Sequence, residues 1–593
     1  MKEKGKTLPK RTPGGTAFKH ARAYRGVYLM ATPVLVAALI FYYLPMFGIR
    51  YAFFTYKGIN DPIFVGMKHF VKMFSMPGFW KAFSNTLVLS ITKLILNTGA
   101  ADIISVLLNE LIFLKLKKVF QTIVYIPHFM SWVVAASIFS MILSPTSAGL
   151  VNDVLMKLHL ITDNIYFLGD QKWWRFSYYI INVWKDTGWG TIIFMATLAG
   201  ISPELYEAAS MDGANRFQKM IYITLPALNN TIVTVLVLNL AKVMNLFESV
   251  FVLQNDAVIK VSDVLQTYIY TQTFNSGAIP DYGYTTAVGM FSSIISCILV
   301  LVCNRVSHKT KRYCMMKKKV KIFDIVLIVI FTVFSLVMII PVYKVLVDSF
   351  DLKTAYGMKL FPEQFGFAGY KSIFTNPTML RPFLISCYTT VMGTIMGLLI
   401  SVLGAYVLIQ WKMPGRAFIA NVLLFTMIFN GGMIPTYLVM KDFHLTNNLW
   451  GVILLPAINV YNLVLMKNFF EGIPVSLMES AEIDGCSHFK ILYKIVLPLS
   501  KAALASIGLM YAVGYWNDYT NYKLYITNSN LYNFQMKLRA LIMGSDLPSA
   551  VEGATENTVK NAAVIVAILP FMIIYPFCQK YFVQGVNIGA VKE

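Results

Sequence analysis

Residues 201–226 read ISPELYEAASMDGANRFQKMIYITLP, and residues 473–498 read IPVSLMESAEIDGCSHFKILYKIVLP. The two stretches lie 272 positions apart, align without a gap and share ten identical residues. A repeat at one fixed offset indicates that the chain consists of two related halves. In each copy the pattern predicts a short helix, a glycine that ends it and a second helix that continues into an apolar run.

The composition around these repeats is that of a membrane protein. Of the 593 residues, 57% are hydrophobic and only 13% are charged, and the mean hydropathy is +0.60. This leaves too little charge to cover a soluble particle of this size, and an aromatic content of 14% excludes a disordered chain. The net charge of +22 does not indicate a nucleic-acid partner, because a nucleic-acid-binding protein would be charge-rich.

The apolar stretches predict an all-α polytopic membrane protein with about twelve transmembrane helices, arranged as two pseudo-symmetric halves of six. A helix needs roughly 20 apolar residues to cross the hydrocarbon core. Twelve stretches have about this length, at about 26–48, 82–108, 119–143, 176–200, 227–253, 282–303, 322–347, 383–409, 418–440, 449–466, 500–515 and 561–578.

The distribution of lysine and arginine predicts that both termini are cytoplasmic, because cytoplasmic loops carry an excess of these residues. With this orientation the cytoplasmic segments hold 28 basic and 10 acidic residues, whereas the outer loops hold 18 and 15. Both repeat loops then face the cytoplasm. The predicted organisation is a basic tail (1–25), a first half (26–303), a basic junction (304–321) and a second half (322–593).

The repeat, as EAASMDG…LP and ESAEIDG…LP, resembles the EAA loop of ABC importer permeases. The resemblance implies the type I ABC importer permease fold, in which each loop is a coupling helix that fits a cleft on a cytoplasmic ATPase subunit. The alternative is an amphipathic loop duplicated without that role. The expected ATPase-coupling residues are Glu207, Ala208, Ala209, Asp212, Gly213, Phe217 and Pro226 in the first copy, and Glu479, Ala481, Asp484, Gly485, Phe489 and Pro498 in the second.

The resemblance continues beyond the repeat. NLFESVFVLQN (245–255) and SDVLQTYIY (262–270) are similar to the larger permease of carbohydrate ABC importers. YWNDY (515–519) and QKYFVQGVNIGAVK (579–592) are similar to the smaller one. The resemblance therefore implies two permeases fused in one multi-pass chain of the cell membrane. It also implies uptake of a carbohydrate, an oligosaccharide, that an extracellular, lipid-anchored binding protein delivers.

Motifs for catalysis are missing from the sequence. The chain has no G-x-x-x-x-G-K-[ST] phosphate loop, and its seven histidines do not have metal-ligand spacing. We therefore expect no enzyme activity, no catalytic residue, no metal and no cofactor in this chain. Two partner ATPase subunits, one per repeat loop, would bind Mg-ATP.

Polar residues within the apolar stretches are candidates for the substrate path, because amides bond to hydroxyls in both directions and aromatic faces stack on sugar rings. The alternative is structural, since tyrosine and tryptophan collect at membrane interfaces and asparagine bonds helix to helix. The candidates are Lys242, Asn245, Glu248, Asn459, Tyr461, Asn462, Tyr511, Tyr515, Trp516 and Asn517.

Twelve spans in two halves also suit an ion-coupled secondary transporter. The two repeat loops favour the ABC importer, because a secondary transporter has no use for an ATPase socket.

Overall fold

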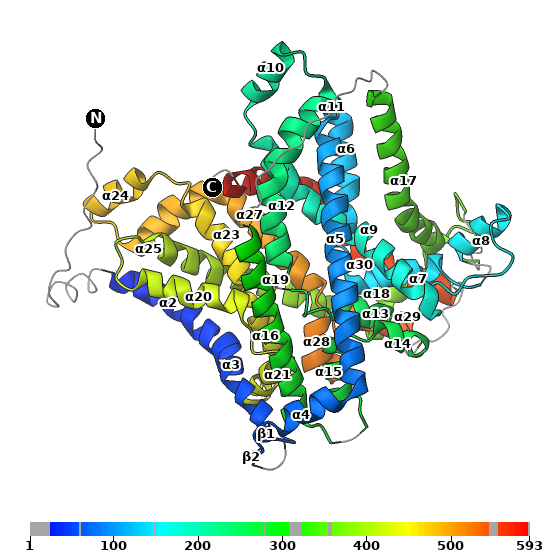
Figure 1. Ribbon diagram of the computed structural model, residues 1–593, viewed down its shortest axis with the longest axis horizontal. Coiled ribbons are helices and arrows are strands. Elements are labelled where there is room, and N and C mark those ends of the chain that lie inside the picture. The colour runs from blue at the N-terminus through cyan, green and yellow to red at the C-terminus, as the bar shows by residue number, and fades with distance from the viewer. Residues whose placement is uncertain are drawn as a thin grey trace.

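The computed structural model describes residues 24–58, 61–146, 149–240, 242–277, 279–307, 323–353, 359–544 and 555–590 (Figure 1). Most of the tail 1–25 and of the junction 304–321 lies outside these ranges. Within them the chain is almost entirely helical, which confirms the all-α prediction. The two described strands, β1 (Phe54–Thr55) and β2 (Ile63–Phe64), pair antiparallel, with Phe54 opposite Phe64.

Seven continuous helical segments in the described part of the chain are long and apolar enough to cross a membrane. They correspond to seven of the predicted spans. The elements that form them are α2 (Arg25–Ala38) with η1 (Leu39–Tyr43), α3 (Leu44–Gly48) and η2 (Ile49–Phe53), then α5 (Pro77–Asn109), α11 (Arg216–Lys219) with η4 (Met220–Thr224) and α12 (Leu225–Leu240), α16 (Tyr282–Ser307), α17 (Phe323–Phe350), α19 (Pro377–Ile409) and α30 (Glu556–Ala590).

Four other predicted spans are each formed by two helices and not by one continuous helix. Each is a pair of helices with a bend at a short break, where a proline, a glycine pair or a capping side chain interrupts the backbone ladder. The pairs are α6 (Leu114–Tyr125) with η3 (Ile126–Phe129) against α7 (Trp132–Ile142), bent by 102°; α20 (Arg416–Ile428) against α21 (Met433–Asp442), 118°; α22 (Leu449–Ala457) against α23 (Val460–Phe470), 46°; and α25 (His488–Ile491) with η6 (Leu492–Val496) and α26 (Leu497–Leu499) against α27 (Lys501–Trp516), 85°.

The one remaining predicted span, 176–200, and the fifth span, already counted among the seven, also differ from simple apolar helices. α9 (Gln171–Ala199) is a continuous 29-residue helix, but Lys185 and Asp186 at its centre make it more polar than the other spans. The fifth span was predicted to run to residue 253, yet α12 ends at Leu240 and the chain becomes helical again only in α13 (Glu248–Leu253).

The two halves repeat the same elements, as the sequence predicts. Three helix pairs match in length, and a five-residue π-helical turn precedes the Leu-Pro step in both copies, where proline cannot donate the usual helix hydrogen bond. The pairs are α4 (Lys68–Ser75) with α18 (Ala368–Thr375), α5 with α19, and α10 (Pro203–Met211) with α24 (Val475–Ile483), while the π-turns are η4 and η6.

One contact locates the pseudo-two-fold axis. The Thr520 hydroxyl donates a hydrogen bond to the Glu248 carboxylate across 3.4 Å, and these residues are 272 positions apart, which is the repeat offset. Two positions related by a two-fold axis can touch only near that axis. The axis therefore passes beside Glu248, between α13 of the first half and α28 (Thr520–Tyr525) of the second.

The first span of each half packs on the other half. The helix α2 packs on α19 and α3 packs on α21, and the Tyr28 and Tyr42 hydroxyls donate to the carbonyls of Pro414 and Ile458 at 2.8 and 2.9 Å. In the opposite direction, α17 packs on α6 and α7. The halves are thus interlocked, and one apolar core continues through both.

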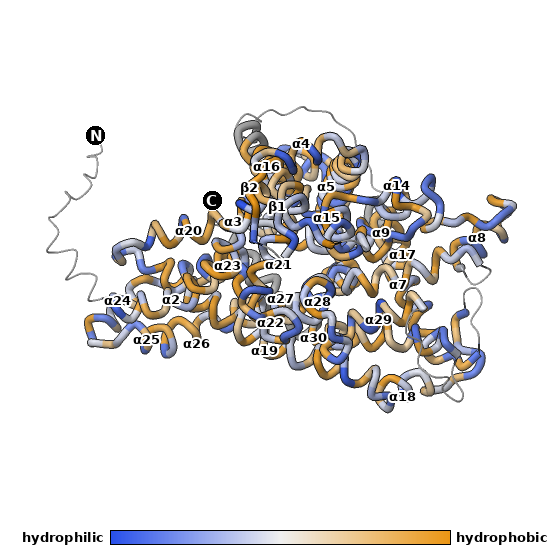
Figure 2. The backbone as a smooth tube through the Cα atoms, turned by 90° about the horizontal axis from the view of Figure 1, so that it is seen from below, coloured by the Kyte–Doolittle hydropathy of each residue, from blue (hydrophilic) through white to orange (hydrophobic). Residues whose placement is uncertain are grey.

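The other short helices connect these spans. Figure 2 shows hydrophobic residues along most helical stretches and hydrophilic ones in connecting segments such as those around α8 and α14. These short connecting helices are α8 (Leu150–Lys157), η5 (Asp256–Val258), α14 (Ile259–Ser262), α15 (Leu265–Phe274), η7 (Ser529–Leu531) and α29 (Phe534–Ile542).

Candidate functional site

The two repeat loops have the same backbone. α10 and α24 are each followed by a glycine in the left-handed region, Gly213 with φ +75° and Gly485 with φ +78°. In the first loop the amide of Ala214 donates to the carbonyl of Ala209 at 2.8 Å, and the equivalent bond in the second loop is 2.9 Å. This six-to-one bond around a left-handed glycine is a Schellman motif, which satisfies the end of the helix and reverses the chain.

Equivalent side chains then tie each loop to the long helix of its own half. Arg216 makes an ion pair with Glu110, just beyond the end of α5, with 3.4 Å between Nε and Oε2. A guanidinium N–H also donates to the Glu110 carbonyl oxygen. His488, at the matching position of the second loop, lies 3.4 Å from the Tyr406 hydroxyl near the end of α19. Each loop is therefore connected to the long helix of its own half through a side-chain contact.

The second loop has additional contacts. The ring of Tyr24, directly before α2, stacks on His488 with 5.3 Å between ring centroids. Lys412 lies 3.1 Å from Glu479, and the hydrogen bond and charge of Glu479 raise the pKa of Lys412. The two loops are thus equivalent in backbone but differ in what surrounds them.

Most of the expected coupling residues lie on the surface of these loops. Large apolar side chains at matching positions are exposed there, Met211 by 89% and Ile483 by 86%. Ala481, by contrast, is buried. The exposed positions are Glu207, Ala208, Asp212, Gly213, Phe217, Glu479, Asp484, Gly485, Phe489 and Pro498, together with Leu205 and Leu477, whereas Ala209 and Pro226 are half-buried.

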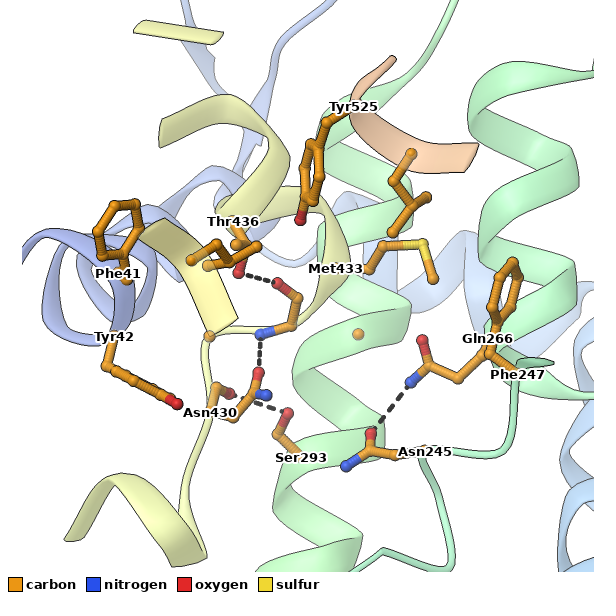
Figure 3. Close-up of a pocket in the computed structure, with 15 residues that line it drawn as sticks. Phe41, Tyr42, Asn245, Phe247, Gln266, Ser293, Asn430, Met433, Thr436 and Tyr525 are labelled. Atoms are coloured by element: carbon orange, nitrogen blue, oxygen red, sulfur yellow. Dashed lines mark hydrogen bonds between the residues drawn. The ribbon is translucent and has the colours of Figure 1, made fainter. Parts of the chain in front are cut away.

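A cavity of about 290 Å³, which we call the interface cavity, lies between the two halves (Figure 3). The first half supplies η1, the turn after α12, α15 and α16, and the second supplies the break between α20 and α21 with α22 and α28. None of the described residues that line it is charged. Its polar side chains are Tyr42, Asn245, Gln266, Ser293, Asn430, Thr436 and Tyr525.

Hydrogen bonds hold these polar groups in place. The Gln266 amide donates to Asn245 Oδ1 at 3.2 Å, and the Ser293 hydroxyl donates to the Asn430 carbonyl at 3.2 Å. Figure 3 shows both bonds linking residues around the cavity. An amide has two donor hydrogens and two acceptor lone pairs, so these bonds leave further capacity for a hydroxyl-rich ligand.

Of the ten substrate-path candidates, Asn245 lines this cavity, and Lys242 lines a separate cavity between α5, α9 and α12. The side chains of four others donate hydrogen bonds to backbone carbonyls of neighbouring elements. These bonds run from Tyr511 to Ala457 (3.2 Å), from Tyr515 to Ile453 (2.6 Å), from Trp516 to Ala567 (2.8 Å) and from Asn517 to Phe129 (2.8 Å).

The last four candidates lie at helix starts. Glu248 begins α13 on the pseudo-two-fold axis. Asn459 caps α23 by accepting the Asn462 amide hydrogen at 3.1 Å, and Asn462 itself is buried. Tyr461, in the first turn of α23, is 36% exposed.

The sequence interpretation did not identify the second-half wall of the interface cavity. Asn430, Gly431 and Gly432 form the break between α20 and α21, and all three line the cavity. The signal was present, because an Asn-Gly-Gly run inside an apolar stretch is typical of a helix break. Irregular backbone within a membrane is tolerated where it is buried in protein or lines a cavity.

One known protein family matches the chain twice. The family described as "binding-protein-dependent transport system inner membrane component" matches residues 103–312 and again residues 315–588. The chain belongs to this family. It carries two copies, so two permease domains are fused in one multi-pass inner membrane protein. As an ABC permease subunit it is not itself an ATPase.

Individual relatives match about half of this permease each. LplC of Bacillus subtilis is 39% identical over 282 residues, which is 46% of this chain and 95% of the relative. The polygalacturonan/rhamnogalacturonan transport permease YteP of B. subtilis is 39% identical over 287 residues, 48% of this chain and 88% of the relative. The trehalose/maltose transport permease MalF of Thermococcus litoralis is 30% identical over 288 residues, with 48% and 93% covered.

A solved structure of a bacterial ABC transporter that imports the acidic polysaccharide alginate is 34% identical in sequence. It covers 50% of this chain and 99% of its own, with a TM-score of 0.46.

Proposed function

We propose that this chain forms the complete membrane channel of an ABC importer for a carbohydrate, an oligosaccharide. An extracellular binding protein delivers the substrate, and two cytoplasmic ATPase subunits bind Mg-ATP and drive transport. Both termini and both repeat loops face the cytoplasm. Several relatives with 28–39% identity are named as permeases for polygalacturonan, arabinooligosaccharides or maltose, which supports a carbohydrate as substrate.

The observation that carries this proposal is the pair of matched repeat loops. Each presents a short helix with exposed apolar side chains, closed by the same left-handed glycine. Apolar patches exposed outside a membrane span indicate contact with another protein. Two equivalent patches related by a pseudo-two-fold axis suit two copies of one partner. An ion-coupled secondary transporter would leave both patches without a partner.

ATP binding would close the two ATPase subunits on each other and move the loops together. Arg216 and His488 would pass that movement to α5 and α19. The interface cavity, with walls from both halves, would then open to the outer side and accept the sugar through its amides and hydroxyls. Hydrolysis would return the cavity to the inner side.

The proposal predicts two ATPase subunits for each chain after purification from native membranes. Mass determination of the detergent-solubilised complex measures this ratio. A chain that purifies alone and transports sugar with an ion gradient would contradict the proposal.

Replacing Phe217 and Phe489 together with alanine should weaken this association. Each exposed phenylalanine contributes about 2 kcal/mol when buried in a partner, so each loop should bind roughly thirty-fold more weakly. The matched control replaces Phe64 and Phe361, which are also exposed but lie far from the loops in sequence. Retention of both ATPase subunits by the double loop variant would refute the docking role.

Arg216→Gln should show whether binding of the ATPase subunit and transfer of its movement to α5 depend on different residues. The variant keeps the apolar face of the first loop but removes its ion pair to the end of α5. We expect the ATPase to remain bound while the uptake per ATP hydrolysed falls several-fold. Lys219→Gln is the control, because the ammonium of Lys219 contacts Ser210 within the same loop. Unchanged coupling in Arg216→Gln would show that α5 does not receive the movement through this residue.

A further inference from the structure

A second cavity, of about 360 Å³, lies within the first half between α5, α9 and α12. Its volume falls in the range of roughly 300–1,000 Å³ that ligand pockets occupy. Unlike the interface cavity, it is lined by charged groups. The polar side chains that define it are Lys93, Asn97, His128, Asp186, Asn239 and Lys242.

This cavity lies deep in the membrane-spanning region. Lys93 is the central residue of the 33-residue helix α5, about 24 Å from either end at 1.5 Å per residue. Asp186 is near the middle of α9. The cavity is thus too deep for a lysine side chain to reach the membrane surface, and charges at this depth mark functional pathways.

The charges of the cavity do not balance. Asp186 is shared between two lysines, at 3.4 Å from Lys93 and 3.7 Å from Lys185. Both ammonium groups also face the ring of Trp132, at 5.3 and 5.1 Å. Lys242 has no carboxylate within 4.0 Å among the described residues. The Lys242 side chain is exposed, so its ammonium group can bind an anion in place of water.

The lining also holds an unused acceptor. Asn97 Oδ1 is buried without a hydrogen-bond partner among the described residues. A buried carbonyl oxygen without a partner is unfavourable, and a hydroxyl donor would satisfy it. The cavity therefore offers a positive charge and an acceptor for a hydroxyl group together.

The two cavities meet at one irregular turn, residues 242–247. Lys242 and Leu246 line the charged cavity, while Asn245 and Phe247 line the interface cavity. The backbone N–H of Asn245 donates a hydrogen bond to the backbone carbonyl of Lys242 at 3.0 Å. A ligand in the interface cavity thus lies one turn of backbone from Lys242.

We propose that Lys242 and its cavity bind the carboxylate of an acidic sugar, so that the imported oligosaccharide contains uronic acid units. This inference rests on the proposed function and names its substrate class. The Lys242 ammonium pairs with the carboxylate, Asn97 Oδ1 accepts a ring hydroxyl, and neutral ring faces and hydroxyls occupy the interface cavity. The position equivalent to Lys242 in the second half is Gly514, so only the first half provides a lysine that can bind the carboxylate.

The test uses the full chain with its ATPase subunits in nanodiscs and without binding protein, so that only the permease can select the ligand. Thermal unfolding is followed with digalacturonate, with its neutral dimethyl ester, and with sodium acetate at equal ionic strength. We expect digalacturonate to stabilise the complex at about tenfold lower concentration than the ester, as a charge-assisted hydrogen bond would provide. Acetate should have no such effect.

Lys242→Gln should remove the preference for the acid and leave the response to the ester unchanged, which also shows that the variant is folded. Lys81→Gln, near the start of α5 and outside the cavity, should behave as wild type. Equal stabilisation by acid and ester, or none by either, would overturn the inference. Equal stabilisation by acetate would show a site for small anions instead.

Uptake of any neutral oligosaccharide by a complex with two ATPase subunits would keep the proposed function while this inference fails. A complex that lacks ATPase subunits and takes up no carbohydrate would contradict the proposed function itself.

Discussion

Valine at both Gly213 and Gly485 is expected to abolish uptake while the chain remains in the membrane. Both glycines have φ near +77°, where a Cβ meets no atom within 4 Å, so the obstacle is the backbone and not the available space. A side chain in the left-handed region costs about 1–2 kcal/mol, and more with β-branching. The loop relieves this strain by giving up its Schellman turn, which displaces Phe217 and Phe489 relative to α10 and α24. Uptake into proteoliposomes and ATPase retention measure the effect.

The chain provides a matched control for backbone strain. Gly66 and Gly277 also have positive φ, +57° and +67°, and a Cβ at either would meet no atom within 4 Å. Valine at these two positions imposes the same kind of strain outside the repeat loops. The control should keep most of its uptake. If both double variants lose uptake equally, or if the loop variant keeps it, the loops have no special role in transport.

The sequence was most informative where a physical requirement is local. A helix that must end and reverse within three residues needs a left-handed glycine, so the repeat predicted α10, α24 and their turns correctly. The long helices α5 and α19 were equally predictable, because 33 residues of mainly apolar sequence have few other conformations in a membrane. The breaks were not predicted because each stretch was counted as one span from its length and apolar content, although Asn-Gly-Gly at 430–432 marked the break that is bent by 118°.

The candidate cavities depended on tertiary contacts and were only partly predictable. Asn245 was found because it is a polar residue within an apolar stretch. Asn430 was missed because its stretch was counted as one span. Tyr511 and Tyr515 show the opposite case. Residues four positions apart share one face of a helix, so both lie on one face of α27, but which helix that face contacts could not be read from α27 alone.

That contact leads to the largest stability effect we expect. Gly393 and Gly397 lie one turn apart on α19, and a Cβ at either would come within 3.0 Å of a tyrosine ring, Tyr515 for the first and Tyr511 for the second. Both rings are buried and bonded through their hydroxyls, Tyr511 to Ser401 at 2.8 Å and Tyr515 to the Ile453 carbonyl at 2.6 Å, so neither can move aside. The Gly-x-x-x-Gly spacing was a signal of close packing in the sequence.

Leucine at both glycines is therefore expected to destabilise the chain by several kcal/mol, since overpacking costs about 1–3 kcal/mol per site. Monodisperse protein recovered in detergent should fall several-fold, and the unfolding temperature of the remainder should drop. The higher helix propensity of leucine relative to glycine would by itself stabilise each position by about 1 kcal/mol, so the cost of overpacking must exceed this gain. Gly514→Leu is the control on α27 itself, because a Cβ there meets no atom within 4 Å.

A compensating change isolates the cause. Removing the Tyr515 ring with alanine leaves a void that Gly393→Leu can fill, so the double variant should be more stable than the sum of the two single effects predicts. Contacting residues typically show such coupling at about 0.5–3 kcal/mol. The same pairing of Gly393→Leu with Tyr511→Ala should show weaker coupling, because Tyr511 lies over Gly397 instead. Strict additivity in the Tyr515 pair would mean that the glycines are needed for another reason than to receive the two rings.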